Sequence, residues 1–259
     1  MKKVKLIVLM FSLLLVLTVS AAALTAEEII DRVDDNQFIE SAYMEARMII
    51  EGRRTTEKEM YSYSRESDAF IEFTNPRDRG TKYLKLGDNL WMFFPDAEEE
   101  VPISGHMLRQ GMAGSDFSYQ DMMESEKLTE LYHFELIGEE EYEFELPGEG
   151  GSEIRSVYVL RGQVKEGKEA SYYERKVWVD ADRFITLREE LYARGGRLLK
   201  VMEVKEVQQF ADERWYPMEM VMEDKLIEDS RTILAIDELE FDVEIPEGVF
   251  SLEALQEQF

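Results

Sequence analysis

Cysteine is absent from this sequence, and histidine is nearly so. Without cysteine the chain forms no disulfide, carries no thiolate nucleophile, binds no metal through sulfur and accepts no lipid on an N-terminal cysteine. The two histidines, His106 and His133, lack the HExxH spacing of a zinc site. The carboxylates follow no calcium-loop pattern. We therefore expect neither a metal nor any other cofactor.

Positive charge is also scarce. Lys and Arg number 30 against 56 Asp and Glu, which gives a formal net charge of −26. Nucleic acids and anionic lipid headgroups repel such a chain, so we expect no nucleic-acid partner. The acidic residues are spread along the sequence rather than gathered in one run, which indicates a solvated surface and not a binding site.

Long hydrophobic runs are limited to the N-terminus. Leu6 to Val19 is almost wholly apolar, follows a lysine-rich start and precedes the small residues Ala21 to Ala23. A membrane-spanning helix needs roughly 20 apolar residues, so this run is short for that role and typical of a secretory signal. We predict that residues 1–23 are a cleaved signal peptide, with an uncleaved anchor as the alternative. The mature protein is then exported and not lipidated.

The remaining sequence reads as one short helix followed by many strands. Thr25 and Glu28 fit a capping box for a helix over residues 26–36. From Ser41 onward the apolar residues recur with period two, and short polar turns such as Pro147 to Gly151 separate the apolar segments. This pattern predicts one long, curved, antiparallel sheet in a single domain at 24–259. The expected strands are 41–51, 58–64, 68–73, 132–145, 153–161, 173–180, 183–193, 196–206, 214–223 and 227–241.

The stretch from Phe73 to Met123 is unusually rich in aromatic residues and methionine. Residues 82–86 and 91–94 predict a hairpin, and 95–100 predict a solvated turn. Residues 104–112 have loose helical spacing between glycines, and a short helix is expected to begin near Asp116 or Ser118. The apolar residues form either a core under a helix or the wall of a lipid cavity. The candidates for this wall or its lid are Phe73, Tyr83, Trp91, Phe93, Met107, Leu108, Met112 and Phe117, with Gly105, Gly111 and Gly114 as hinges.

Catalytic patterns are weak in the same stretch. Ser104, His106 and Asp116 supply the residue types of a hydrolase, but no GxSxG nucleophile elbow is present and the serine and histidine are only two residues apart. The glycines are not followed by GK[ST], so they do not form a phosphate loop. We expect no catalytic residues.

Three segments carry a family resemblance: NPRDRGTKYL at 75–84, LWMFFP at 90–95 and ISGHMLRQGMAGSDFSYQDM at 103–122. With them the chain resembles the LolA-like bacterial outer-membrane lipoprotein-sorting proteins, in the subgroup that carries the ISGHMLRQ and GSDFSY block. The resemblance implies an α+β, mainly antiparallel fold: an incomplete, strongly curved β-barrel covered by short helices that act as a lid. Arg47 is a weak candidate for the functional arginine of the periplasmic carriers.

The resemblance also implies a function. It points to a non-enzymatic periplasmic carrier whose apolar cavity receives acyl chains of lipoproteins or other lipids. Its expected partners are an inner-membrane transport complex of ABC or RND type and an outer-membrane acceptor. The alternative is an envelope accessory or scaffold protein that works with an export or efflux complex without a lipid cargo.

Overall fold

The computed structural model describes residues 24–146, 150–211 and 213–257. The predicted signal peptide and most of the predicted turn at 147–151 lie outside these residues. The described chain forms a 13-stranded sheet in the order β6-β5-β4-β3-β2-β1-β13-β12-β11-β10-β9-β8-β7. Every neighbouring pair is antiparallel. Two meanders, β1–β6 and β7–β13, therefore join where the first strand pairs with the last.

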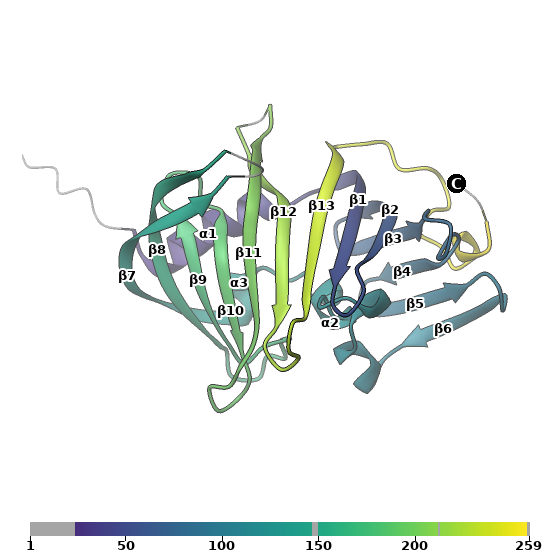
Figure 1. Ribbon diagram of the computed structural model, residues 1–259, viewed down its shortest axis with the longest axis horizontal. Helices are drawn as coiled ribbons and strands as arrows, with labels where there is room; N and C mark the ends of the chain where they lie inside the picture. The colour runs from purple at the N-terminus through teal and green to yellow at the C-terminus, as the bar shows by residue number, and fades with distance from the viewer. Residues whose placement is uncertain (1–23, 147–149, 212, 258–259) are drawn as a thin grey trace, which may run out of the picture.

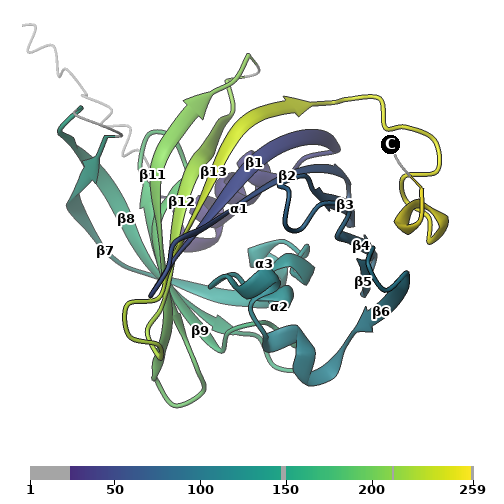
Figure 2. The same cartoon turned by 45° about the vertical axis from the view of Figure 1, so that its right-hand side comes forward.

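The sheet is long, curved and not closed, and short helices lie within the curve (Figures 1 and 2). This architecture confirms the predicted fold class. We call the face that holds the helices the inner face and the opposite one the outer face. The strands are β1 Ser41–Glu51, β2 Thr56–Arg65, β3 Asp68–Phe73, β4 Lys82–Leu86, β5 Asn89–Phe94, β6 Glu99–Ile103, β7 Tyr132–Glu145, β8 Ser152–Val164, β9 Glu174–Asp180, β10 Thr186–Tyr192, β11 Leu198–Gln209, β12 Trp215–Asp224 and β13 Arg231–Phe241.

Helix α1, Ala26–Gln37, begins at the capping box that the sequence predicted. The Thr25 side chain accepts a hydrogen bond from the Glu28 backbone, and Glu28 bonds back to the Thr25 backbone. Ile29, Ile30 and Val33 are fully buried in a cluster with residues of β7, β8 and β9. The helix thereby covers the inner face of the second meander.

Residues 104–123 pack on the inner face of the first meander, and we call them the flap. They contain two 3-10 helices, η1 Gly105–Arg109 and η2 Met112–Gly114, followed by α2 Tyr119–Met123. Of the two expected caps for α2, Ser118 is the one that forms it, in a capping box with Asp121. Helix α3, Leu128–Leu131, then leads into β7.

Alternation along β3, β4 and β5 separates two cores. Phe73, Tyr83 and Met92 point to the inner face, under the flap. Phe70 and Leu84 point to the outer face, where the C-terminal segment that contains η3, Glu253–Leu255, packs over them. Both faces of this part of the sheet are thus buried.

Methionine is confined to the inner-face cores. Met1 and Met10 precede the described residues, and every other one of the 14 methionines packs in a cluster under the flap or beside α1 and α2. Methionine is unbranched and flexible, so it fills irregular spaces and adapts to different apolar shapes. Because these cores are rich in methionine, the inner face of the sheet can adapt its shape to what packs against it.

Candidate functional site

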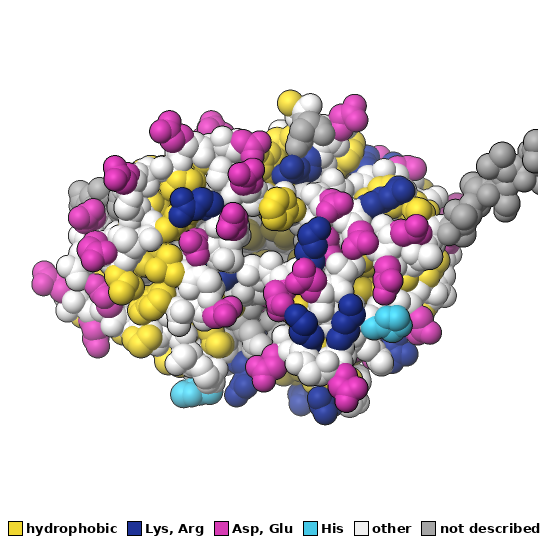
Figure 3. Space-filling view, turned by 180° about the vertical axis from the view of Figure 1, so that it is seen from behind, with side chains coloured by type: hydrophobic (Ala, Val, Ile, Leu, Met, Phe, Trp, Pro, Cys, Tyr) yellow, Lys and Arg dark blue, Asp and Glu magenta, His cyan; other side chains and the backbone are white. Residues whose placement is uncertain are grey.

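A cavity of about 380 Å³ lies in the inner face between α1, α2 and strands β9–β12. The molecule is visibly hollowed near the middle of the face that carries the helices, with acidic and basic side chains around the hollow (Figure 3). The volume falls within the roughly 300–1,000 Å³ of small-molecule sites. One side of the cavity is apolar and comes from alternate residues of the strands, namely Leu191, Met202, Val204, Met220 and Met222.

The flap determines where this cavity lies. Met107, Leu108 and Met112 pack with Phe73 and Tyr83 and cover much of the inner face of the first meander. Beyond them the flap carries Phe117 across to the second meander, where it packs against Tyr172, Leu191 and Met222 and lines the cavity. The flap leaves the inner face over β9–β12 open, and the cavity lies there.

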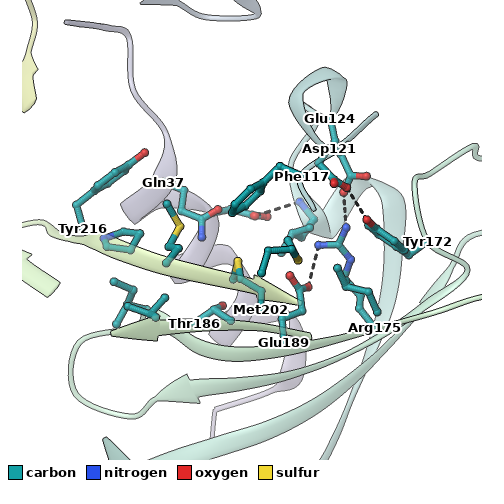
Figure 4. Close-up of a pocket in the computed structure, with 18 of the residues that line it drawn as sticks. Gln37, Phe117, Asp121, Glu124, Tyr172, Arg175, Thr186, Glu189, Met202 and Tyr216 are labelled. Atoms are coloured by element: carbon teal, nitrogen blue, oxygen red, sulfur yellow. Dashed lines mark hydrogen bonds and ion pairs between the residues drawn. The ribbon is translucent and has the colours of Figure 1, made fainter. Parts of the chain in front are cut away.

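The polar end of the cavity is built on a buried arginine. Arg175 of β9 and Glu189 of β10 are 6% and 8% exposed. Arg175 Nη1 donates to Glu189 Oε1 at 2.9 Å, and Nη2 donates to Glu124 just after α2 (Figure 4). The guanidinium also stacks 4.6 Å from the centre of the Tyr132 ring. These contacts fix the position of the guanidinium, which pairs with two carboxylates at once.

Burial and pairing act in opposite directions on these groups. Burial disfavours the charged form of Arg175, but the carboxylates of Glu189 and Glu124 raise its pKa above the ordinary value. Burial raises the pKa of Glu189, and Arg175 opposes that rise. Each charge of the pair therefore compensates the other for the water that it loses on burial, and removing either one would leave an unpaired buried charge.

Asp121 links the flap to the same end of the cavity. One of its oxygens accepts from the Tyr172 hydroxyl at 2.6 Å, and the other accepts from Lys200 Nζ at 2.9 Å and from the Ser118 backbone at 2.7 Å. Burial, with the nearby Asp121 carboxylate, raises the pKa of Tyr172 well above its ordinary value. One carboxylate therefore caps α2 and joins it to β11 and to the segment just before β9.

The predicted wall residues divide among three places. Phe73, Tyr83, Met107, Leu108 and Met112 come together under the flap, and Phe117 lines the cavity over β9–β12. Trp91 and Phe93 belong to the outer-face core beneath the C-terminal segment. The structure does not place these two with the others, because β5 alternates and Leu90 and Met92 take the inner positions.

A second cavity, of about 540 Å³, lies between the flap and the loop at 76–81. Phe73 and Tyr83 contribute to it, together with Gly111 and Gly114. Its other side is charged, since Lys58 pairs with Asp78 at 2.8 Å and Arg77 and Arg79 follow in the loop. We favour the cavity over β9–β12 as the functional site because its apolar residues form a continuous floor.

The backbone conformation or close packing at each flap glycine favours a residue without a side chain, whether or not the flap moves. Gly105 and Gly114 have φ values of +57° and +85°, a region that favours glycine. Gly111 lies so close to the Ser115 backbone that an added Cβ would be 2.0 Å from its carbonyl oxygen. Their role as hinges stays a prediction.

The residue types considered for chemistry are dispersed. Ser104 and His106 are exposed, whereas buried Asp116 accepts hydrogen bonds from Ser230 and Thr232 at the start of β13. Arg47 lies on the outer face, where it pairs with Asp237. Across the described parts of the chain, no group of three or more His, Asp or Glu side chains is placed to hold a metal ion. Nor does any helix there have the length and apolar character to cross a membrane.

Sequence reasoning missed Arg175, Glu189, Met202 and Met220. The available signal was a charged residue at an inward position of an otherwise apolar strand. Arg175 precedes Val177 and Val179 on one face of β9, and Glu189 precedes Leu191 on β10. Such residues are buried only when paired, so each one predicts a partner on a neighbouring element.

Solved structures of other proteins share this fold, among them the following three. A DUF1329 family protein from Desulfovibrio piger is 27% identical, with a TM-score of 0.77 over 89% of this chain and 98% of that one. A putative outer membrane lipoprotein-sorting protein domain from Vibrio parahaemolyticus is 22% identical, with a TM-score of 0.75 over 90% and 98%. A LolA superfamily protein from Nitrosomonas europaea is 20% identical, with a TM-score of 0.69 over 90% and 100%.

No curated protein matches the chain. A family model described as "Uncharacterized protein" matches residues 65–257, which include the flap, the cavity strands and the C-terminal segment. The match extends over well more than half of the sequence, and the first of the three structures is that of a DUF1329 family protein. The chain is therefore a member of this family, the DUF1329-like proteins, and has the LolA-like fold.

Proposed function

We propose that this protein is a non-enzymatic carrier that binds the acyl chains of lipoproteins or other lipids in the cavity over β9–β12. The observation that supports it best is the cavity itself, with its floor of leucine, valine and methionine side chains from β10, β11 and β12. Each methylene of an acyl chain that leaves water for such a surface contributes about 0.8 kcal/mol. The fold that it shares with a lipoprotein-sorting domain and a LolA superfamily protein is consistent with this role.

The finer proposal follows from the predicted signal peptide. The mature chain, residues 24–259, acts as one unit in the periplasm and takes part in sorting lipoproteins to the outer membrane. An inner-membrane transport complex of ABC or RND type loads it, and an outer-membrane acceptor unloads it. In this proposal the flap is a lid. Phe117 and the adjoining Glu124 close one side of the cavity. Polar contacts of Asp121 and Asp116 join this end of the flap to the second meander.

One observation favours a second candidate, an envelope scaffold protein without a lipid cargo. The flap packs an apolar core against the inner face of the first meander, and a packed core is what a scaffold requires. The two candidates differ in whether purified protein carries lipid. Native mass spectrometry of protein purified from its own envelope should show a bound acyl species, whereas a scaffold would give only the mass of the chain.

A filled cavity provides the direct test in solution. Met220→Trp places a larger side chain in the floor, and delipidated protein with this change should bind a fluorescent glycerol mono-ester at least about ten-fold more weakly. Ile154→Trp is the matched control, because Ile154 is 61% exposed on β8 and lines none of the described cavities. Equal affinities for both variants and the wild type would remove the cavity from the proposal.

A further inference from the structure

The cavity is acidic as well as apolar. Asp34, Asp121, Glu124, Glu126 and Glu189 all line it, and among the described lining residues Arg175 is the one cation. Lipid head groups differ most in charge, so the charges at the cavity bear directly on which acyl compound it accepts.

The cations beside the cavity are already engaged. Arg175 bonds to both Glu189 and Glu124. Lys200 Nζ lies 2.9 Å from Asp121, and Lys168 Nζ lies 2.8 Å from Glu126. An anionic head group in the cavity would therefore face carboxylates without a free positive partner, and its loss of water would be uncompensated.

One of the buried carboxylates still has capacity for a ligand. Glu189 is 8% exposed and lines the cavity (Figure 4). Its Oε1 accepts from Arg175, whereas Oε2 accepts no hydrogen bond from the described residues and is not among the atoms sealed off from solvent. A carboxylate oxygen in this state can only accept, so its complement is a hydroxyl or an amide N–H.

From this geometry we infer that the cavity takes acyl chains whose head group carries no negative charge and donates a hydrogen bond. The inference rests on the proposed function and narrows its substrate class. Ester- and amide-linked acyl chains with hydroxyl or N–H groups meet the requirement, whereas free fatty acids and phosphate-headed lipids do not. A carrier with this preference leaves anionic membrane lipid in place while it collects uncharged cargo.

Three ligands with the same acyl chain test the inference by calorimetry on delipidated protein below their micelle concentrations: lauroyl glycerol, laurate and lauryl phosphate. Lauroyl glycerol should bind at least about ten-fold more tightly than either anion, as expected for one unfavourable charge interaction at short range. Comparable binding of all three would overturn the charge preference and leave the carrier proposal intact. Absence of binding by lauroyl glycerol would defeat the carrier proposal itself.

An added positive charge at the cavity tests the cause. Gln37 is an exposed lining residue at the end of α1 and makes no hydrogen bond to the described residues through its side chain. Gln37→Lys should raise the affinity for laurate by about five-fold relative to the affinity for lauroyl glycerol. Gln208→Lys is the matched control, since Gln208 is exposed on β11 and lines none of the described cavities. An equal gain in both variants would assign the effect to net charge rather than to the cavity and would overturn the inference.

Discussion

A buried ion pair joins β8 to the end of β9. Asp180, at the end of β9, is fully buried and accepts two hydrogen bonds from Arg155 at 2.7 and 2.9 Å. The backbone N–H groups of Asp182 and Arg183 donate to the same carboxylate. Burial would raise the pKa of Asp180, but Arg155 and these N–H groups bring it below the ordinary value. The folded state therefore stabilises the ionised carboxylate.

We predict that Asp180→Asn lowers the free energy of unfolding by about 3 kcal/mol near pH 7, because it leaves the Arg155 guanidinium without its buried partner. The folded pKa of Asp180 is lowered, so its contribution is present above the ordinary carboxyl pKa and is lost as pH falls through the folded pKa. Urea titrations of both proteins from neutral to acidic pH should show the difference shrinking. Asp182→Asn is the control: its side chain is 81% exposed, and a comparable loss there would refute the assignment.

At the scale of elements, the bounds of several strands could be predicted from the sequence, whereas one edge strand could not. The period-two pattern located β3 and β7 to the residue. It missed β6, Glu99–Ile103, because its acidic residues and Pro102 are typical of a turn. β6 is an edge strand that pairs only with β5, and an edge tolerates proline and charge because half of its backbone groups need no partner in the sheet.

The cavity was harder to predict than the strands. The aromatic and methionine residues of 73–123 indicated the side of the cavity that Phe117 lines, but the floor comes from β10, β11 and β12, far along the chain. Their proximity depends on β1 pairing with β13 and on the curvature of the sheet. Neither feature can be recognised from a local sequence pattern. Arg175 and Glu189 can be recognised only as isolated charges in apolar strands.

The close turn in the flap yields a prediction about this element. A Cβ at Gly111 would be 2.0 Å from the Ser115 carbonyl oxygen, so Gly111→Ala must open the turn that brings Met112 and Phe117 into place. We expect a loss of about 2 kcal/mol of stability or more. Thermal unfolding measures it, with Gly52→Ala as the control because a Cβ there has no atom within 4 Å. Equal melting temperatures would show that the flap accommodates the methyl group freely.

At the scale of the whole molecule, the sheet separates the cavity on its inner face from a second core on its outer face. The inner face holds the methionine-rich cores and the cavity. On the outer face the C-terminal segment covers Phe70 and Leu84, and buried Lys82 donates to the Ala254 carbonyl at 3.3 Å. Substitutions in the outer core should therefore change stability without changing the cavity on the inner face.

Leu252 and Leu255 in the C-terminal segment allow this separation to be tested. Leu255 is fully buried in the outer core and Leu252 is 40% exposed. Leu255→Ala should lower the free energy of unfolding by about 2–5 kcal/mol, whereas Leu252→Ala should change it by about 0.5 kcal/mol or less. Denaturant titration measures both. Well below its unfolding transition, Leu255→Ala should keep the wild-type affinity for lauroyl glycerol, because the sheet lies between the substitution and the cavity. A weakened affinity in still-folded Leu255→Ala would show that the outer cover shapes the cavity through the sheet, contrary to this division.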